Sequence, residues 1–460
     1  MHMTRRSLLA GLAASATLPA LSARAAAQSD LRAQVANMQL LPAEYGRTQI
    51  WGYGGTMPGA EIRLAQGERV RRKLVNDLPQ PTSVHWHGIR IDNAMDGASG
   101  VTQAAVSPSD TFDYDFVVPD AGTYWYHSHN RSMEQVARGL YGALIVEEPT
   151  PPDVDRDEVL ILDDWRINPD TAQIDGDFSS LHDRSHAGRV GNFIATNGVY
   201  GLTKSARRNE RIRLRLINAA NARIFELQLV GLEGWIVALD GMPLETPQRF
   251  GESLLLGPAQ RADVIVDVTV DEGDTAQVLA VQNGQALPQV VFDVSGSASA
   301  TRRPEPTPLP TNAHPMVSLP DATPLKLNME GGAMSGFRSG MLGGERMGAR
   351  ELAQLGQMWA FNGVVWQPED PPIARFSRGE NVRLAIRNET AFPHAMHLHG
   401  MHFHEVEENG SLGPLRDTTL LFANQTREIA FVADNPGKWL LHCHMLSHAA
   451  SGMMSTVEVA

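Results

Sequence analysis

The feature that most constrains the fold of this chain is an eight-residue segment that occurs three times with small changes. Residues 69–76 (RVRRKLVN), 211–218 (RIRLRLIN) and 381–388 (NVRLAIRN) largely alternate apolar with charged residues and end in asparagine. Such alternation is typical of a β-strand, because successive side chains point to opposite faces. Repetition of one strand along a chain predicts repeated units of similar fold.

A second, longer repeat links the first unit with the last. Residues 116–129 and 431–444 share a strand, a turn containing glycine and a second strand, and both segments end in a pair of histidines. The chain has 460 residues, with 41 Gly and 28 Pro, so it is too long for one ordinary domain and rich in turn formers. We therefore predict an all-β protein of three consecutive Greek-key sandwiches or barrels.

The repeats and a Pro-rich stretch set the expected domain boundaries. We expect domains at 38–150, 155–298 and 321–460, with a linker at 299–320. In the middle unit the repeated strand is followed by residues 223–227 (RIFEL), which contain no histidine. We therefore expect the second domain to have no metal ligands.

Residues 1–27 have the pattern of an export signal. Arg5 and Arg6 precede an apolar run at 8–21, and small residues suited to cleavage follow at 23–27. The paired arginines resemble a twin-arginine signal, which implies a bacterial periplasmic protein exported in folded form. The apolar run is shorter than the roughly 20 residues that span a bilayer, so we expect no membrane anchor after cleavage. A formal net charge of -13 argues against nucleic acid as a partner.

Four His-x-His pairs are the strongest chemical signal in the chain. In a strand, residues i and i+2 point to the same face, so each pair can present two imidazoles to one side. Two pairs lie in the first unit and two in the third, and repeat-related strands could bring all eight rings together where these units meet. The pairs are His85 with His87, His127 with His129, His397 with His399, and His442 with His444.

Cys443 is the single cysteine of the chain and lies between two of these histidines. It has no partner for an internal disulfide, and its side chain should point to the face opposite its neighbours. Two histidines, one cysteine and a weak axial methionine form the usual electron-transfer copper site. His448 and Met453 follow Cys443 at short spacing, and His394 closely precedes the His397 pair, so these three residues could complete such a site. The tripeptide would then connect this site to the histidine cluster through covalent bonds.

Four motifs resemble the copper motifs of the multicopper oxidases, of the bacterial three-domain laccase or cuprous oxidase type. They are residues 84–88 (VHWHG), 125–129 (WYHSH), 394–400 (HAMHLHG) and 442–448 (HCHMLSH), followed by Met453. The resemblance covers essentially the whole chain after the signal. It implies three cupredoxin-like Greek-key β-barrel domains, four copper ions per chain, and reduction of dioxygen to water by four one-electron oxidations of a substrate.

The resemblance also implies a role for each ligand. The type 1 copper, which accepts the electrons, would be held by His394, Cys443, His448 and axial Met453. The type 2 copper would be held by His85 and His397. The type 3 pair would be held by His87, His127, His129, His399, His442 and His444. Types 2 and 3 together would form the trinuclear centre that reduces dioxygen.

Several of these residues have an alternative interpretation. A single His-x-His pair is more often a solvated strand pair or a pair of core histidines, and only the four pairs together favour copper. Asp96 resembles the acid that relays protons to oxygen in many relatives, but residues 95–97 (MDG) also fit a plain turn. Ala449 stands where some bacterial relatives carry a glutamate thought to pass protons, which puts that proton route in doubt.

The remaining histidines are predicted not to bind copper. His402 and His404 form a fifth pair outside the matched positions, and we expect them near the type 1 site as non-ligands. His182, His186 and His314 have no partner at useful spacing and are expected at the surface.

Two classes of electron donor are consistent with the sequence. A Gly-rich stretch resembles a sparse form of the methionine-rich insert of the cuprous oxidases, and thioethers are soft ligands for Cu(I). Its methionines are Met329, Met334, Met341, Met347 and Met358. However, Phe392 stands where a methionine would serve Cu(I) better, and methionines also fill cores. We favour Cu(I) over the small aromatic reductants of laccases, and both over a non-catalytic scaffold with a vestigial copper site. We expect a monomer.

Overall fold

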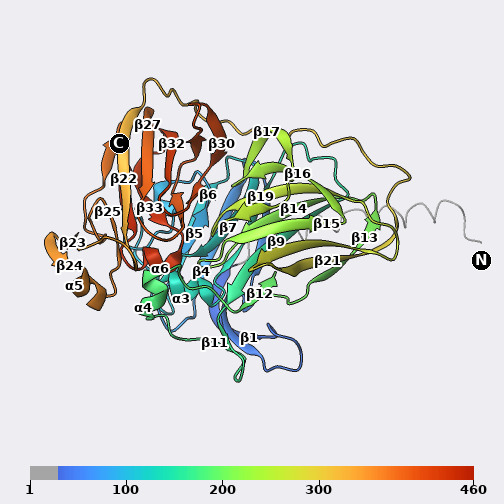
Figure 1. The fold of residues 1–460 in the computed structure, drawn as a ribbon, viewed down its shortest axis with the longest axis horizontal. Coiled ribbons are helices and arrows are strands. Elements are labelled where there is room, and N and C mark those ends of the chain that lie inside the picture. The colour runs from blue at the N-terminus through green and yellow to red at the C-terminus, as the bar shows by residue number, and fades with distance from the viewer. Residues whose placement is uncertain (1–29) are drawn as a thin grey trace, which may run out of the picture.

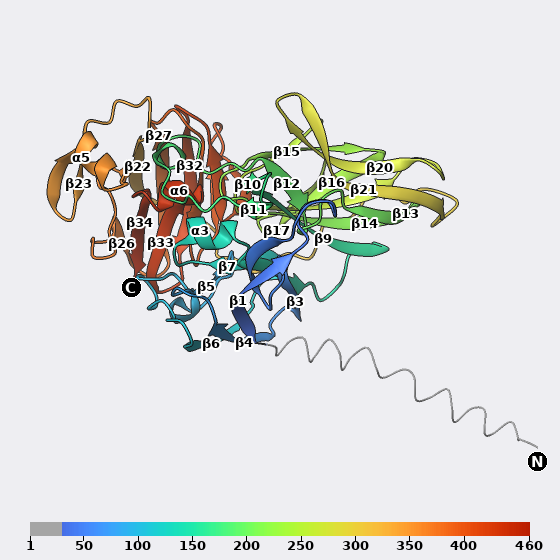
Figure 2. The ribbon, with the colours of Figure 1, turned by 90° about the horizontal axis from the view of Figure 1, so that it is seen from below.

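The computed structural model describes residues 30–460, so the predicted export signal at 1–27 lies outside the described residues. The described chain is built mainly of β-strands in three units of two sheets each, and the prediction of an all-β, cupredoxin-like fold is confirmed. Figure 1 shows the second unit in green and yellow and the third in orange and red, with the blue and cyan strands of the first unit between them. Figure 2 shows the same arrangement from below.

The first unit has two four-stranded sheets. One has the order β2 (Thr48–Tyr53), β1 (Leu31–Met38), β4 (Arg69–Asn76), β6 (Thr111–Val117). The other has the order β3 (Gly59–Ala65), β8 (Tyr141–Glu147), β7 (Gly122–Ser128), β5 (Val84–His87).

The second unit has a six-stranded and a five-stranded sheet. The larger sheet has the order β12 (Phe193–Thr196), β9 (Arg156–Trp165), β14 (Arg211–Asn218), β19 (Arg261–Val268), β16 (Leu232–Leu239), β17 (Met242–Arg249). The smaller has the order β13 (Thr203–Arg208), β21 (Gln285–Ser297), β20 (Thr275–Gln282), β15 (Phe225–Val230), β18 (Leu254–Leu256).

The third unit also has a six-stranded and a five-stranded sheet. The first has the order β25 (Trp359–Phe361), β22 (Thr323–Gly331), β27 (Glu380–Asn388), β32 (Thr426–Ala433), β29 (Phe403–Val406), β30 (Leu412–Arg416). The second has the order β26 (Ala374–Phe376), β34 (Met454–Val459), β33 (Gly437–Cys443), β28 (His394–Leu398), β31 (Thr418–Leu421).

Short elements connect these sheets. They are the hairpins β10 (Ile167–Asn168) with β11 (Gln173–Ile174) and β23 (Ser339–Leu342) with β24 (Glu345–Gly348), the 3-10 helix η1 (Asn93–Met95), and the helices α3 (Ser132–Ala137), α4 (Leu181–Ser185), α5 (Ala349–Gln354) and α6 (Leu446–Ala449). Within residues 30–460, no helix has the length and apolar character needed to cross a membrane.

The repeated segment occupies the same place in each unit. It forms β4, β14 and β27, and each of these strands pairs in parallel with the first strand of its unit, namely β1, β9 and β22. On its other side each pairs antiparallel, with β6, β19 and β32 respectively. The weak sequence repeat therefore reflects one topology used three times.

The asparagine that ends each repeat forms the same kinds of hydrogen bond in all three units. The side-chain oxygens of Asn76, Asn218 and Asn388 each accept a hydrogen bond from the backbone N–H two residues later. Each side-chain amide also donates to carbonyls of the turn that follows or of a neighbouring loop. A buried asparagine thus satisfies backbone groups where the strand ends, and this requirement explains its recurrence.

The middle repeat departs from simple alternation, because all eight positions of β14 are buried. Two of its arginines contact residues of the first unit, Arg213 through Glu148 and Arg215 through Thr123. All three arginines are paired with carboxylates, as buried charges must be. The pairs are Arg211 with Asp267, Arg213 with Asp263 and Glu148, and Arg215 with Asp157.

The first and third units share one continuous apolar core. Buried side chains of both units, such as Trp86 and Tyr114 from the first and Trp439 and Met396 from the third, belong to the same cluster. The second unit has a separate core of its own around β14, β19 and β20. The contact between the first and third units is therefore the place where a buried site can be built from both ends of the chain.

We predict that Asn218→Ala lowers the free energy of unfolding by about 2 kcal/mol, because two buried carbonyls lose their donor and one N–H loses its acceptor. Urea unfolding followed by circular dichroism measures this. The matched control is Asn409→Ala, which removes a similar bond to the N–H two residues later at an exposed turn, and it should change stability by less than about 0.5 kcal/mol. Equal losses in the two variants would contradict this account of the repeat.

Candidate metal centre

The residues predicted from the sequence lie in two groups on opposite faces of β33. The Cys443 cluster consists of His394, Cys443, His448 and Met453. The eight-histidine cluster consists of His85, His87, His127, His129, His397, His399, His442 and His444. Cys443 points into the first group and its two neighbours point into the second, as a strand requires.

The ring nitrogens of the Cys443 cluster converge on the thiol. The Cys443 Sγ lies 3.4 Å from His394 Nδ1 and 3.7 Å from His448 Nδ1, and the two Nδ1 atoms are 3.1 Å apart. Met453 is fully buried, and its carbonyl accepts a hydrogen bond of 3.1 Å from the Cys443 N–H. These atoms can surround one small ion with a soft sulfur donor and two imidazoles.

The outer nitrogens of the same two rings are held by the protein. His448 Nε2 donates to the His186 carbonyl at 2.7 Å, and His394 Nε2 is hydrogen-bonded to Thr390 Oγ1 at 2.8 Å. Because the carbonyl holds the proton of His448 on Nε2, His448 Nδ1 presents a lone pair toward Cys443. Both rings are completely buried.

Burial also determines the ionisation of the cysteine. It raises the pKa of the Cys443 thiol to about 12, and a Met445 N–H at 3.4 Å from the sulfur only partly compensates. Without an ion, the sulfur therefore keeps its proton at neutral pH. A bound cation would replace that proton, because a thiolate is the form that ligates metals.

The eight-histidine cluster is built from two antiparallel strand pairs. In β5 and β7, His85 lies opposite His127, and in β28 and β33, His397 lies opposite His442. The rings meet across the boundary between the first and third units. His87 stacks on His397 at 3.7 Å between centroids, and His85 stacks on His399 at 3.9 Å.

Burial keeps most rings of this cluster neutral, and hydrogen bonds hold several of them in fixed orientations. Burial lowers the pKa values of His87, His127, His399, His442 and His444 well below the ordinary range, and neighbouring histidines lower them further. Six of the eight rings form a hydrogen bond between one ring nitrogen and a protein oxygen. The pairs are His85 with Asp96 O, His87 with Asp417 Oδ1, His127 with Ser128 O, His397 with Asp417 O, His399 with Asp96 Oδ2, and His442 with Cys443 O.

The remaining ring nitrogens of the cluster indicate whether it can bind metal ions. His85 Nε2, His87 Nδ1, His127 Nε2, His397 Nε2 and both nitrogens of His444 are buried without any hydrogen-bond partner. An unpaired buried polar atom costs about 1–3 kcal/mol, so leaving this many unpaired in one place needs an explanation. Bound metal ions supply it, and sets such as His85, His397 and His399 already have their ligand atoms within 4.8 Å of one another.

Asp96 lies inside the site, as the proton-relay interpretation requires. Its carboxylate is fully buried, and its oxygens are 3.0 and 3.1 Å from His399 Nδ1 and 3.3 Å from His85 Nδ1. The residue follows η1, so it occupies a tight turn as well. Asp96 therefore fits both interpretations of the sequence, a residue of a turn and a candidate proton relay.

Asp417 is a site residue that the sequence analysis missed. It lies between β30 and β31, and its Oδ1 is 3.1 Å from His87 Nε2 while its carbonyl accepts from His397 Nδ1. Burial alone would raise the pKa of Asp417, but the Arg261 guanidinium, 2.6 Å away, and the hydrogen bond from His87 hold it well below its usual range. No spacing pattern marks a lone aspartate whose partners His87 and Arg261 lie in other units of the chain.

His402 is not where the sequence analysis placed it. We expected it near the type 1 site, but its Nε2 lies 3.9 Å from Asp417 Oδ2, on the side of the eight-histidine cluster. Its ring is 5.2 Å from that of His314, which is largely buried rather than at the surface as expected. The chain turns at Gly400, after the end of β28, and His402 comes just before β29 begins at Phe403.

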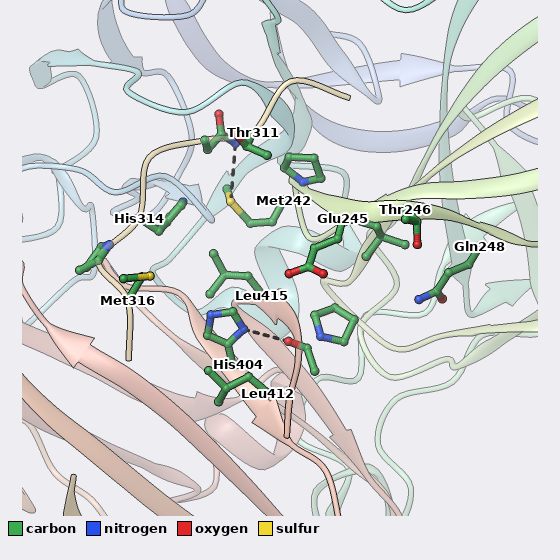
Figure 3. Close-up of a pocket in the computed structure, with 16 residues that line it drawn as sticks. Met242, Glu245, Thr246, Gln248, Thr311, His314, Met316, His404, Leu412 and Leu415 are labelled. Atoms are coloured by element: carbon green, nitrogen blue, oxygen red, sulfur yellow. Dashed lines mark hydrogen bonds between the residues drawn. The ribbon is translucent and has the colours of Figure 1, made fainter. Parts of the chain in front are cut away.

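A cavity of about 400 Å³, lined in part by His314, lies where the second unit, the linker and the third unit meet. Figure 3 shows His314, Met316 and His404 on one side of it and Glu245, Thr246 and Gln248 on the other. His404 Nδ1 donates to the Gly413 carbonyl at 2.8 Å, the dashed contact in Figure 3. This cavity borders the Asp417 side of the molecule and not the Cys443 cluster.

Three models of multicopper oxidase domains match the chain, at residues 34–151, 156–287 and 345–460. The chain is 31% identical to multicopper oxidase MmcO of Mycobacterium tuberculosis over 88% of this chain and 82% of the relative. It is 26% identical to copper resistance protein A of Pseudomonas syringae pv. tomato over 99% of both. Its fold is similar to that of a multi-copper oxidase from Pseudomonas thermotolerans, with a TM-score of 0.82, 32% identity, and 94% and 99% of the two chains covered.

We predict that the metal-free protein loses stability as the pH falls below about 6.5. Burial lowers the pKa of His448 to about 3, whereas in the unfolded chain it is about 6.5. Between these values the unfolded chain binds a proton that the folded one does not, so stability is present above pH 6.5 and falls by roughly 1.4 kcal/mol per pH unit for this residue.

Urea unfolding of metal-free protein at several pH values between about 7.5 and 5.5 measures the slope. His448→Gln should make it shallower by the contribution of that one residue. An identical slope in the variant and the natural sequence would contradict the account of a neutral, buried His448.

Proposed function

The chain belongs to the multicopper oxidase family, and on this premise we propose that it oxidises Cu(I) at the Cys443 cluster and reduces dioxygen to water at the eight-histidine cluster. It is an oxidoreductase with copper as its cofactor. The choice of Cu(I) as the electron donor, the four-electron reduction and the assignment of individual ligands are the parts that we propose.

We assign the ligands by motif and by the donor atoms that each group offers. The type 1 ligands are His394, Cys443, His448 and Met453; the type 2 ligands are His85 and His397; the type 3 ligands are His87, His127, His129, His399, His442 and His444. This set holds four copper ions. Bound copper would supply the one-electron redox chemistry at Cys443 and the dioxygen chemistry between the two units. The unpartnered buried nitrogens and the thiol support this assignment.

One observation favours Cu(I) over aromatic donors. Both imidazoles of the Cys443 cluster are fully buried, and their outer nitrogens are already hydrogen-bonded to Thr390 and to the His186 carbonyl. A phenol would need direct access to one of these ring edges in order to pass its electron on. A small cation can instead bind outside the residues that cover these two rings and pass its electron inward through a hydrogen bond.

The relatives support the same choice. Two similar proteins, one of Pseudomonas syringae pv. tomato and one of Escherichia coli, are named for copper resistance. Of the methionines that suggested copper handling, Met329 is buried in β22, whereas Met334 is 77% exposed and follows Ala333, whose N–H donates to the Ser185 carbonyl of α4. The methionine stretch therefore contributes one exposed thioether at this place, and Met347 packs against the core of α5.

The chain's own residues would also manage the protons of oxygen reduction. Asp96 is buried next to His399 and His85, so its carboxylate can hold a proton beside the place where dioxygen would be reduced. Asp417 sits against the other side of the cluster and orients His87 and His397. Ala449 lies in α6 and offers no acid there. We therefore propose Asp96 as the proton donor.

The remaining proposals concern the whole protein. We propose a monomer that is exported to the periplasm by the twin-arginine route, with cupredoxin domains at 38–150, 155–298 and 321–460 and a linker at 299–320. The paired arginines and the Pro-rich stretch of the sequence support this organisation. Copper handling outside the cytoplasm is consistent with it.

We predict that copper-loaded protein is blue, with absorption near 600 nm, roughly where Cu–thiolate sites absorb. Its kcat/KM for Cu(I) should exceed that for 2,6-dimethoxyphenol by at least about tenfold. Oxygen uptake with each donor, measured at the same low concentration of free Cu(II), gives the comparison. A higher kcat/KM for the phenol would favour the laccase reaction. A colourless protein after copper loading would favour a non-catalytic scaffold.

We predict that Asp96→Asn lowers the rate of oxygen reduction by about 100-fold or more, because a positioned acid usually contributes that much. The blue colour should still bleach at the normal rate when donor is added without oxygen, since the Asp96 carboxylate contacts His85 and His399 and not the residues of the Cys443 cluster. Stopped-flow absorption at 600 nm separates the two steps. Asp92→Asn, at an exposed position just before η1, is the control that should change neither rate; slower anaerobic bleaching in Asp96→Asn would contradict the role.

A further inference from the structure

Two histidines outside both clusters lie against each other where the linker meets the third unit. His314 belongs to the linker, and His402 lies just before β29 in the third unit. Their ring centroids are 5.2 Å apart, with 80° between the planes. Neither residue belongs to the four motifs that resemble those of the multicopper oxidases, so the proposed function gives neither of them a role.

The spacing of these two rings is that of two imidazoles that share one ion. Two imidazole nitrogens bound at about 2.0 Å to one tetrahedral ion hold their ring centroids roughly 5 Å apart. In the Cys443 cluster, the rings of His394 and His448 are 4.9 Å apart, with 62° between the planes. The rings of His314 and His402 therefore have nearly the same arrangement as a pair already assigned to a metal.

The ring nitrogens of this pair are buried and lack partners. His314 Nε2 and both nitrogens of His402 form no hydrogen bond, and the side chain of His402 is only 2% exposed. Asp120 Oδ2 is 3.7 Å from His314 Nε2, and Asp417 Oδ2 is 3.9 Å from His402 Nε2, so both oxygens lie beyond hydrogen-bond distance. Each unpaired buried nitrogen costs about 1–3 kcal/mol, so three of them in one pair of rings need an explanation.

The two rings are in the form that binds metal ions. Burial lowers the pKa of His314 to about 4 and the pKa of His402 well below its ordinary range, so both rings are neutral at neutral pH. The neighbouring carboxylates of Asp120 and Asp417 are already hydrogen-bonded to guanidinium groups and need no protonated histidine as a partner. A neutral imidazole keeps a lone pair, which is what a metal ion requires.

An ion can reach this pair from the cavity that Figure 3 shows. His314, His404 and Glu245 line the cavity. Because His404 Nδ1 donates to the Gly413 carbonyl, its Nε2 stays available as a further ligand. Glu245 adds a negative charge that favours a cation in the cavity. The remaining coordination positions can be filled by His404 or by water.

The linker beside His314 is already fixed to the other two units. The side chain of Asn312 accepts from the Ala121 N–H at 2.9 Å and donates to the Ala121 carbonyl at 2.8 Å, in the first unit. Its Nδ2 also lies 3.7 Å from Met242 Sδ, in the second unit. An ion between His314 and His402 would join the third unit to the same segment of the linker.

We propose that His314 and His402 bind a divalent transition-metal ion of the Zn(II) or Cu(II) class, at a site that ties the linker to the third unit. Imidazoles suit these ions, whereas Ca²⁺ and Mg²⁺ prefer oxygen ligands. The site goes beyond the proposed function and does not depend on the electron donor. Its ion has a structural role: because it binds the folded chain, it stabilises the docking of the units around the linker.

Zn(II) is the probe for this site, because it undergoes no redox chemistry. Titration calorimetry of the copper-loaded enzyme should show Zn(II) binding that weakens by about tenfold or more in His314→Gln and in His402→Gln, since even the loss of an outer partner of a ligand costs about 10–100-fold. Backbone hydrogen exchange of residues 309–316 should slow when Zn(II) is added to the natural sequence, and should not respond to Zn(II) in either variant. Absorption near 600 nm checks that each variant is folded and copper-loaded.

The matched control is His182→Gln, which alters another pair of histidines. His182 and His186, which the sequence analysis expected at the surface without partners, stack on each other at α4 with centroids 4.0 Å apart. This variant should leave the effect of Zn(II) on residues 309–316 unchanged. If His182→Gln abolishes that effect, if Zn(II) does not slow exchange there in the natural sequence, or if His314→Gln and His402→Gln bind Zn(II) as tightly as the natural sequence, the inferred site is wrong and the proposed function stands.

Discussion

Eight imidazoles gather where the first and third units meet, and the other contacts of the structure keep them there. The rings of His87 and His397, and those of His85 and His399, stack across the boundary between the two units. Burial lowers the pKa values of six of these rings, and carbonyls or carboxylates engage the nitrogens that face away from the cluster. Because several inner nitrogens have no protein partner, metal binding and the docking of the two units should stabilise each other.

The strand β33 gives this buried cluster its connection to the outside. Its alternation places His442 and His444 in the cluster and Cys443 on the opposite face, against His394 and His448. The same alternation leaves the thiol buried, so an ion must replace its proton. The second unit contributes none of the side chains of the two clusters, but its helix α4 covers the outer edge of His448, because the His186 carbonyl accepts the hydrogen bond from His448 Nε2. The second unit therefore contributes to the Cys443 cluster by covering one of its histidines.

Short-range periodicity predicted the parts of the fold and of the site that depend on a single strand. The three repeats, the end-of-strand asparagines and the four His-x-His pairs are all visible in segments of eight residues or fewer. The parts that it missed depend on contacts between distant segments. Asp417 and Arg261 come from different units, and the buried arginines of β14 are acceptable only because carboxylates of neighbouring strands face them. The helix α4 was missed because a helix of five residues has no periodic signal.

In the proposed function, electrons taken from Cu(I) at the Cys443 cluster reduce dioxygen completely to water at the eight-histidine cluster. The most direct test is the ratio of Cu(I) oxidised to dioxygen consumed by the copper-loaded enzyme, measured together with any hydrogen peroxide released. The account predicts four Cu(I) per dioxygen and no peroxide, because the tripeptide joins the two clusters and Asp96 supplies protons beside the second. Two Cu(I) per dioxygen with one peroxide released would contradict it.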